Sequence, residues 1–346
     1  MTRTGPQIDL VALDVGGANI KAADGLGFAH AEPFALWREW RQLPAALERI
    51  LRAVAPARIV ATMTGEIADC YPSRAAGVAH IVASLQQAAD ASGCQTAPGI
   101  YLVDGRIAST EEALREPLQA AASNWHALAR LAAQQATAEP CLLLDVGSTT
   151  VDIVPLVAGR PAPLASDDAG RMRTGELVYT GMERTPLAAL VRRLPHAGGM
   201  RPVAAEVFAT SRDAWLVLGE LPEDASACDT ADGGPATRDA ARRRLARSLL
   251  LDAEAITAAD AVAAATHVAA TQARIVARAL ARVAAACAWR PACIVVSGHG
   301  SRLARMAIER TGWTPALALL ADRLGASVSR VAPAHALALI ARGAIP

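Results

Sequence analysis

The chain has 346 residues, which is enough for two domains or one large one. Hydrophobic residues make up 53% of the sequence and charged residues 19%, a balance typical of a globular protein. The formal net charge is only +1 and no basic tract stands out, so the sequence lacks the electrostatic signature of a nucleic-acid-binding protein.

The sequence also argues against secretion and against a membrane partner. Its first six residues contain no apolar core of the signal-peptide type. No uninterrupted apolar stretch reaches the roughly 18 residues of a membrane-spanning helix. The six cysteines include no Cys-x-x-Cys pair, which argues against a structural zinc site and a disulfide scaffold. These features predict a cytoplasmic protein.

The chain opens with two strands joined by a glycine turn. Ile8–Val15 is rich in aliphatic residues and is followed by Gly16 and Gly17, and Ile20–Ala23 is predicted to pair with it as a hairpin. Helices and strands then alternate, as in an α/β protein. The sequence predicts helices at Pro44–Val54, Ala75–Ala91 and Leu118–Gln135, strands at Arg58–Met63 and Gly99–Val103, and a turn at Asp104-Gly105.

The opening pattern returns about 130 residues later, at Cys141–Leu156. In both places an aliphatic strand is followed by Asp-Val-Gly, small polar residues and a second strand. Aligning the two acids, Asp14 and Asp145, places Gly16 on Gly147. A unit that is used twice predicts two lobes of related build, each offering a glycine turn to a shared cleft.

The boundary between the lobes is placed by the repeat, near residue 138. Residues 1–138 form the first predicted lobe, 139–330 the second, and 331–346 a C-terminal helix that returns to the first. The later predicted elements are a mostly helical segment at Arg238–Ala286, a strand at Ile294–Gly298 followed by a glycine turn and a helix, a short strand at Ser327–Ala332 and a helix at Ala334–Arg342.

Lys21 is the only lysine of the chain, beside 33 arginines. It follows the first glycine turn, and the repeat places Asp152 at the same position after the second. Lysine is a compact point charge, whereas arginine is a planar fork. A lysine kept at this position therefore indicates a site that needs the smaller cation, most commonly for a phosphate oxygen.

Glycine turns that follow strands let backbone N–H groups approach phosphate oxygens, because no Cβ intervenes. Two such turns facing each other would hold a polyphosphate from both sides. The carboxylates of Asp14 and Asp145 would repel a phosphate, so we expect them to hold Mg²⁺ through water or to position a nucleophile.

These motifs resemble those of the superfamily of actin, sugar kinases and Hsp70-like ATPases. Leu13–Lys21 is similar to its first phosphate motif, Leu144–Ile153 to its second and Ile294–Arg302 to its adenosine motif. The Gly-Ser-Thr-Thr-Val-Asp-Ile run is close to the hydantoinase A and oxoprolinase branch. The resemblance implies a two-lobed α/β fold with a duplicated ribonuclease H-like unit and an interlobe cleft.

Other segments resemble one family within that branch, the tetrahydromethanopterin-linked one-carbon-transfer family. Its members are the condensing enzymes of methanofuran biosynthesis in archaea and belong to methylofuran biosynthesis in methylotrophic bacteria. The resemblance implies a transferase that joins an aminomethylfuran-methyl diphosphate to the phenol oxygen of a glutamyl-tyramine or tyrosine-like acceptor and releases diphosphate. The segments are Thr62–Cys70, Gly175–Gly181, Arg184–Pro186, Glu206–Thr210 and Asp224–Thr237, within a similarity that runs from about residue 8 to 342.

The implied reaction assigns roles to residues on both lobes. A base is needed because the free phenol has a pKa of about 10, and Glu66, Asp69 and Asp152 stay open for it. The predicted catalytic residues are Asp14, Lys21, Glu66, Asp69, Asp145 and Asp152, with Asp14 and Asp145 on Mg²⁺. The predicted phosphate contacts are Gly16, Gly17, Ala18, Asn19, Lys21, Gly147, Ser148, Thr149, Thr150, Gly298, His299 and Gly300. The predicted substrate contacts are Thr64, Tyr179, Thr180, Gly181, Arg184, Thr185, Asp224 and Asp229.

The sequence departs from the wider superfamily in both turns. Ala18 stands where many relatives carry Thr, and Ser148 replaces the second glycine of a pair. Both changes disfavour ATP or ADP as a cofactor more than they disfavour diphosphate. The expected partners are small molecules, with a homodimer left open. Two alternatives remain: an ATP-dependent small-molecule kinase or hydantoinase/oxoprolinase-like amide hydrolase, and a non-catalytic nucleotide-sensing protein.

Overall fold

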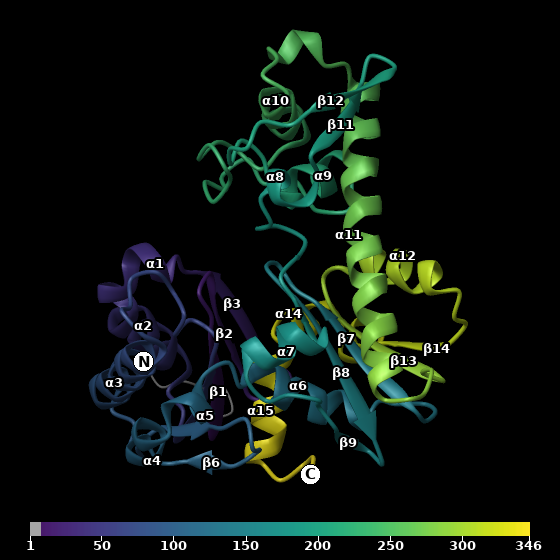
Figure 1. The fold of residues 1–346 in the computed structure, drawn as a ribbon. Helices are drawn as coiled ribbons and strands as arrows, with labels where there is room; N and C mark the ends of the chain where they lie inside the picture. Colours follow the sequence, from purple (N-terminus) through teal and green to yellow (C-terminus); the bar gives the residue numbers. More distant parts are fainter. Residues whose placement is uncertain (1–7) are drawn as a thin grey trace. The chain divides into compact units, whose positions relative to one another are not determined.

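The computed structural model describes residues 8–346, which divide into two compact units (Figure 1). The first unit comprises the described residues up to Ala136 together with Leu156–Asp168 and Leu319–Pro346. The second unit comprises Thr137–Pro155 and Ala169–Ala318. The sequence-based division placed residues 1–138 and the C-terminal helix 331–346 in the first lobe; the structure adds Leu156–Asp168 to this unit and begins its C-terminal segment at Leu319.

The first unit contains a six-stranded sheet with the order β3-β2-β1-β4-β5-β6. β1 and β2 form the expected antiparallel hairpin, while β1, β4 and β5 run parallel. Parallel strands end at the same edge of a sheet, so the first glycine turn and the residues after β4 come together. The strands are β1 (Leu10–Val15), β2 (Asn19–Ala23), β3 (Ala29–Pro33), β4 (Arg58–Met63), β5 (Gly99–Tyr101) and β6 (Ile107–Ala108).

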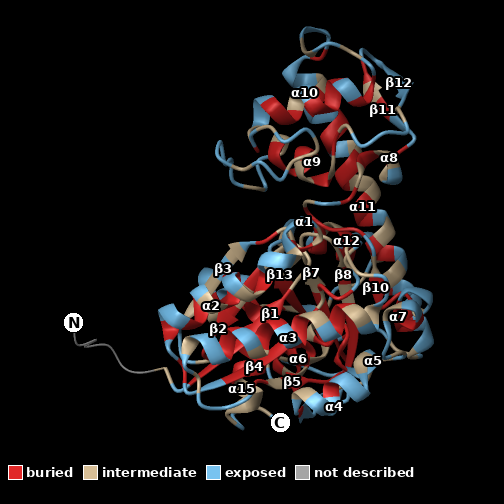
Figure 2. Ribbon diagram, turned by 90° about the vertical axis from the view of Figure 1, so that its left-hand side faces the viewer, coloured by how far each residue is buried: buried red, intermediate tan, exposed pale blue. Residues whose placement is uncertain are grey.

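Helices cover both faces of the first sheet. Val11, Leu13 and Val15 on alternate positions of β1 share one core with α2 and α3. On the other face α15 contacts β1, β2 and β4, and Figure 2 shows β1 and β4 as buried strands. The helices of this unit are α1 (Leu36–Glu39), η1 (Trp40–Gln42), α2 (Leu43–Val54), α3 (Arg74–Ser92), α4 (Thr110–Arg115), α5 (Pro117–Ala120), α6 (Asn124–Ala133), α13 (Leu320–Leu324), α14 (Ala326–Arg330) and α15 (Ala332–Ala341).

The sheet of the second unit repeats the order of the first. Its strands lie as β10-β8-β7-β13-β14, with β9 beside β8, so that β7 and β13 take the places of β1 and β4. β7 and β13 are parallel, as β1 and β4 are. The duplicated ribonuclease H-like α/β fold is thereby confirmed. The strands of this sheet are β7 (Cys141–Val146), β8 (Val151–Val157), β9 (Arg160–Pro161), β10 (Leu177–Val178), β13 (Cys293–Gly298) and β14 (Ala316–Leu319), and β9 lies in the segment Leu156–Asp168 that is counted with the first unit.

The second unit also contains an inserted core, defined here by residues 187–268. Leu187, Leu194, Leu245 and Val268 contribute to it, and the first half of α11 is one of its walls. Among residues 8–346, no helix combines the length and the apolar run that crossing a membrane requires. The remaining elements are α7 (Asp168–Thr174), α8 (Leu187–Leu190), β11 (Arg193–His196), β12 (Gly199–Pro202), α9 (Ser211–Val217), α10 (Arg238–Ser248), η2 (Ala253–Ala255), α11 (Ala258–Ala286) and α12 (Ser301–Thr311).

Two predicted elements are wrong. The helix predicted at Leu118–Gln135 is split into α5 and α6, because Ala121 is extended and Ala122 adopts a left-handed conformation with φ of 48°. The strand predicted at Ser327–Ala332 is helical, in α14 and the start of α15. The N–H of Ser329 donates to the carbonyl of Gly325, which closes a helical turn that the valine-rich pattern did not indicate.

Candidate functional site

The first glycine turn joins β1 to β2 in the first unit. The N–H of Gly16 donates to the carbonyl of Asn19 at 3.0 Å, and the carbonyl of Ala18 accepts from the N–H of Phe34 at 2.9 Å. A Cβ on Gly16 would lie 3.0 Å from the Asn19 carbonyl oxygen, whereas a Cβ on Gly17 would meet nothing within 4 Å. The turn is therefore tightly packed at its first glycine and open at its second.

Asp14 and Lys21 flank this turn as register partners on β1 and β2. The Nζ atom of Lys21 lies 3.5 Å from Oδ2 of Asp14, and the lysine side chain is 28% exposed. The other oxygen of Asp14, Oδ1, is buried and has no hydrogen-bond partner among residues 8–346. Burying an unpaired carboxylate oxygen is unfavourable, so this atom is available to a metal ion or to metal-bound water.

The end of β4 packs directly against the turn. The N–H groups of Thr64 and Gly65 both donate to the carbonyl of Val15, at 3.0 and 3.1 Å. A Cβ on Gly65 would lie 2.4 Å from Cδ2 of Leu36 and 3.2 Å from the carbonyl carbon of Gly16. The absent side chain at Gly65 thus lets the predicted substrate residue Thr64 lie beside Gly16.

Glu66 follows Gly65 and is fully buried. Neither carboxylate oxygen has a hydrogen-bond partner among the described residues. The pKa of Glu66 is raised to about 7, chiefly by burial and additionally by the charge of Asp168, while Arg74 acts against the rise. Arg74 and Asp168 form an ion pair with 2.9 Å between Nη2 and Oδ2. A carboxyl group with this pKa can accept a proton near neutral pH.

The two other predicted bases have different surroundings. Asp69 is exposed, in the turns between β4 and α3. Asp152 lies on β8, and its Oδ1 is 2.9 Å from Nη1 of the buried Arg171. Asp152 therefore forms an ion pair with a buried arginine, and Asp69 is exposed to solvent. Glu66, in contrast, is fully buried.

The second glycine turn, between β7 and β8, has the same closure as the first. The N–H of Gly147 donates to the carbonyl of Thr150 at 2.9 Å. The carbonyl of Ser148 accepts from the N–H groups of Glu183 and Arg184, at 2.9 and 3.0 Å. The segment that contains Glu183 and Arg184 is therefore fastened to the second turn by its backbone.

Gly181 allows this segment to approach the turn. A Cβ on Gly181 would lie 2.5 Å from the carbonyl carbon of Ser148 and 2.6 Å from the N atom of Thr149. The hydroxyls of Thr180 and Thr185 are buried and lie 3.3 Å apart, and Thr185 also accepts from the N–H of Gly181 at 3.0 Å. These two threonines thus hold the turn in shape, and their direct contact with substrate stays a prediction.

A buried glutamine completes that arrangement. The Nε2 atom of Gln272 on α11 donates to the hydroxyl of Thr180 and to the carbonyl of Gly181, both at 2.9 Å. Its Oε1 accepts from Nε1 of Trp215 on α9 at 2.9 Å. Gln272 therefore connects the inserted core to the second glycine turn, a role that the sequence did not indicate.

Asp145 lies at the end of β7, opposite Ser297 on β13. A Cβ on Gly298 would lie 3.1 Å from Oδ1 of Asp145 and 2.1 Å from the carbonyl oxygen of Val146, and Gly298 has a φ of +79°. A Cβ on Gly300 would lie 2.2 Å from Cγ1 of Val146. The late glycine turn therefore packs closely against the strand that carries Asp145.

His299 lies between these two glycines and contacts Glu183. Its Nε2 is 2.9 Å from Oε1 of Glu183, and Arg212 contacts the other oxygen of that carboxylate. Arg212 also donates to both oxygens of Asp229, at 2.6 and 2.8 Å. Burial raises the pKa of Glu183, but the hydrogen bond from His299 and the charge of Arg212 outweigh it and bring the pKa down to about 2. Glu183 is therefore ionised.

Of this group, the sequence indicated His299 and Asp229 but missed Glu183 and Arg212. Glu183 lies two residues from the predicted Gly181, so its neighbourhood carried a signal, whereas nothing in the sequence singled out Arg212. Tyr179 and Arg184 are exposed, as substrate-contacting residues would be. Asp224 is exposed and accepts hydrogen bonds from Ser226 within its own loop, and these bonds together with the charge of Arg212 lower its pKa.

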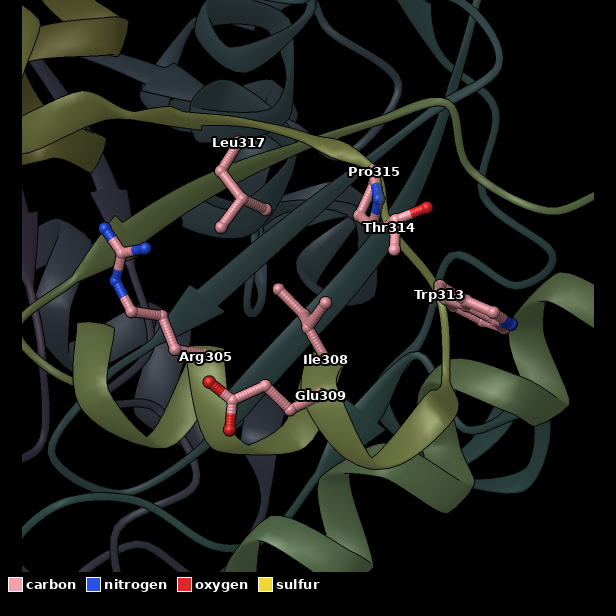
Figure 3. A pocket seen from close by; sticks show the side chains of 7 residues that line it. All are labelled: Arg305, Ile308, Glu309, Trp313, Thr314, Pro315 and Leu317. Carbon is pink, nitrogen blue, oxygen red and sulfur yellow. The ribbon is translucent and has the colours of Figure 1, made fainter.

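Two hollows of the second unit lie away from the predicted residues. One, of about 190 Å³, lies between α12 and β14 (Figure 3). The other, of about 240 Å³, lies between α10 and the start of α11. The first is lined by Arg305, Ile308, Glu309, Trp313, Thr314, Pro315 and Leu317.

Two relatives have names that describe an activity. A protein of Methanocaldococcus jannaschii is 31% identical over 253 residues, covering 72% of this chain and 74% of the relative. A protein of Methanococcus vannielii is 37% identical over 122 residues, covering 35% of this chain and 54% of the relative. Both are named (4-{4-[2-(gamma-L-glutamylamino)ethyl]phenoxymethyl}furan-2-yl)methanamine synthase.

Solved structures and a family model were also matched. A ROK hexokinase from Thermus thermophilus has a TM-score of 0.42 at 18% identity, over 96% of this chain and 99% of that one. A ROK glucokinase from Streptomyces griseus, in complex with glucose and AMPPNP, has a TM-score of 0.47 at 12% identity, with the same coverage. The model of the hydantoinase/oxoprolinase family matches residues 58–341, more than half of the chain. The chain belongs to the hydantoinase/oxoprolinase family.

Proposed function

We propose that this protein is a transferase of methanofuran-type cofactor biosynthesis. It joins an aminomethylfuran-methyl diphosphate to a phenolic acceptor, forms an aryl ether and releases diphosphate. The observation that carries this proposal is the 31% identity over 253 residues to a synthase whose name describes a phenoxymethyl-furan product. The geometry of both glycine turns supports it, as follows.

The first turn suits the leaving group. A furfuryl carbon loses diphosphate readily because the furan ring stabilises positive charge, so the protein mainly has to bind and stabilise the departing anion. Lys21 offers a partly exposed ammonium group beside this turn, and Gly17 leaves the backbone accessible. Gly17 lies in the turn between β1 and β2 and Lys21 lies on β2, so the hairpin fixes their positions before substrate arrives.

Mg²⁺ fits the site only if substrate supplies part of its shell. Oδ1 of Asp14 is a buried acceptor with no hydrogen-bond partner in the part of the chain that the structure describes. No group of three or more His, Cys, Asp or Glu side chains within residues 8–346 is arranged to hold a metal ion. Mg²⁺ commonly takes one or two protein carboxylates and completes its shell with phosphate oxygens and water. Asp14 would hold it in that way, and it would neutralise charge on the diphosphate.

Glu66 is the proton acceptor that the surroundings favour. The phenol must lose its proton to form the ether, and a carboxyl with a pKa of about 7 is partly ionised at neutral pH. Neither of its oxygens has a hydrogen-bond partner among residues 8–346, so each keeps acceptor capacity for the phenol O–H. Tyr179 and Arg184 are exposed and offer an aromatic ring and a guanidinium group to the acceptor.

The test is a reconstituted reaction. The purified protein is incubated with the furan diphosphate, Mg²⁺ and either glutamyl-tyramine or a tyrosine analogue, and released diphosphate and the ether are measured by enzyme-coupled assay and mass spectrometry. We expect stoichiometric diphosphate and ether without ATP. Turnover of Mg-ATP with no ether would contradict the proposal and favour the kinase or amide-hydrolase alternative.

A further inference from the structure

The side chain of His299 is held in one orientation by an ionised partner. Its Nε2–H donates to Oε1 of Glu183 at 2.9 Å, and Arg212 fixes the other oxygen of that carboxylate. Arg212 is itself held by two hydrogen bonds to Asp229. When a second residue holds one oxygen of a carboxylate, the other oxygen can fix the orientation of an imidazole. It also determines which ring nitrogen forms the hydrogen bond to the carboxylate.

The other ring nitrogen of His299 is available to a ligand. No hydrogen bond from Nδ1 to another residue within 8–346 is present, and the side chain is 35% exposed. The ring is thus tethered through one nitrogen and open at the other, the arrangement in which a histidine transfers a proton.

The pair is fixed relative to the second glycine turn from two sides. The N–H of Glu183 donates to the carbonyl of Ser148 in the turn itself, at 2.9 Å. On the other side, Gly298 and Gly300 enclose His299, and each packs so closely on Val146 that a Cβ would lie 2.1 to 2.2 Å from its atoms. A hypothetical Cβ on Gly298 would also be 3.1 Å from Oδ1 of Asp145. Both members of the pair are therefore positioned by the backbone that is proposed to bind phosphate.

We propose that His299 is the group that protonates the leaving diphosphate, with Glu183 as its positioning residue. In this step the furfuryl C–O bond breaks, its electron pair stays on the diphosphate oxygen, and Nδ1–H of protonated His299 transfers its proton to that oxygen. The phenol oxygen forms the new C–O bond and gives up its proton to a base. His299 regains a proton from solvent before the next turnover. This assignment rests on the proposed transferase function.

The test varies the acidity of the leaving group. The wild type and His299→Gln are compared on the natural diphosphate and on analogues whose P–O–P bridge is replaced by CH₂, a poorer leaving group, or by CF₂, a better one. Glutamine keeps a hydrogen-bond donor but carries no transferable proton. We expect His299→Gln to lower kcat by about 10²- to 10⁴-fold with the natural substrate, the range for losing a general acid. We expect this fall in kcat to be larger with the CH₂ analogue and smaller with the CF₂ analogue.

Further variants separate proton transfer from positioning. Imidazole in solution restores part of the activity of His299→Ala. Glu183→Gln lowers kcat about tenfold or more, while the KM for the furan diphosphate stays within about twofold. His267→Gln, on α11, and Glu220→Gln, whose carboxylate lies near Arg302 at 3.6 Å, are the matched controls and keep wild-type rates.

The outcomes distinguish this assignment from the function on which it rests. An active wild type whose loss in His299→Gln is the same for all three leaving groups overturns the assignment and leaves the transferase standing. A wild type that forms no ether with any donor overturns the transferase itself. Thermal unfolding of each variant, with His299→Asn as a second substitution, shows whether a loss reflects misfolding.

Discussion

The ammonium nitrogen of Lys21 lies 3.5 Å from Oδ2 of Asp14, its register partner across the β1–β2 hairpin. That distance exceeds the 2.7 to 3.2 Å of an ordinary N–H···O hydrogen bond, so the two groups attract each other without being locked together. The lysine is therefore able to turn toward an anion at the glycine turn while it remains beside the buried acid.

Replacing Lys21 by arginine tests whether the turn needs a compact cation. The larger fork cannot occupy the same space beside Asp14, so we expect kcat/KM to fall about 10²-fold, the scale of losing one charge-stabilising donor. Arg49→Lys, at an exposed ion pair with Glu32, is the reciprocal control and keeps wild-type activity. Steady-state kinetics measure kcat/KM for both variants. Wild-type turnover in Lys21→Arg would show that the mechanism does not need a lysine at this position.

Glu66→Gln tests the proposed proton acceptor. Glutamine has the same shape but cannot take a proton, so kcat/KM should fall by about 10²- to 10⁴-fold. In the wild type the activity should rise with pH through about 7, as Glu66 ionises between Asp168 and Arg74. Glu111→Gln, at an exposed ion pair with Arg115, is the control and keeps wild-type activity. A rate profile that keeps its rise near pH 7 in Glu66→Gln would assign the proton transfer elsewhere.

The same carboxyl group makes stability depend on pH. Because its pKa is about 7 in the fold against an ordinary value of 4.5, the native state binds more protons than the unfolded state between these limits. The free energy of unfolding should therefore decrease by about 3 kcal/mol as the pH rises from about 4.5 to about 7. Urea titrations at several pH values measure this, and the decrease should be absent in Glu66→Gln. If the free energy of unfolding falls equally with pH in the wild type and in Glu66→Gln, burial of Glu66 is not the cause of the decrease.

Gly181→Ala tests the packing of the second turn. The added methyl group would lie 2.5 Å from backbone atoms of Ser148, which cannot move away as a flexible side chain can. We expect a loss of about 1 to 3 kcal/mol in stability and at least tenfold weaker diphosphate binding. Gly199→Ala is the matched control, since its methyl group would meet nothing within 4 Å. Calorimetry of diphosphate binding and of unfolding checks both expectations, and unchanged affinity in Gly181→Ala would argue against a phosphate role for this turn.

Gln272→Leu tests the link between the inserted core and the same turn. The substitution leaves the hydroxyl of Thr180, the carbonyl of Gly181 and the indole N–H of Trp215 without their partner. Buried polar groups left unsatisfied cost about 1 to 3 kcal/mol each, so a loss of about 2 to 5 kcal/mol is expected. Gln86→Leu on α3, where the amide contacts Asp90 at the surface, should change stability by less than about 0.5 kcal/mol. Chemical denaturation of both variants provides the measurement.

Much of the fold could be predicted because its signals are local. The run Arg58–Met63 is a strand with the predicted bounds, and the hairpin of β1 and β2 was visible from its glycine pair. The helix at Leu118–Gln135 was predicted as one piece because nothing in an alanine-rich run marks the left-handed residue at Ala122. That break depends on tertiary packing around Ser123, whose hydroxyl bonds Thr62 and the carbonyl of Tyr101.

The site was only partly visible in the sequence for a similar reason. Glycines and acids at strand ends have a recognisable spacing, so Asp14 and Gly147 could be named in advance. Glu183 and Arg212 could not be paired, because they are 29 residues apart and meet only when α9 packs beside the second turn. The raised pKa of Glu66 likewise comes from burial, which no local pattern reveals.

The position of α15 in the chain has a consequence for biosynthesis. This helix covers β1, β2 and β4, yet the whole second unit is translated between those strands and the helix. A nascent chain on the ribosome must therefore keep one apolar side of its earliest sheet uncovered until residues 332–341 have been synthesised. An isolated fragment ending near residue 138 would keep that apolar face of the sheet exposed, and we expect it to aggregate.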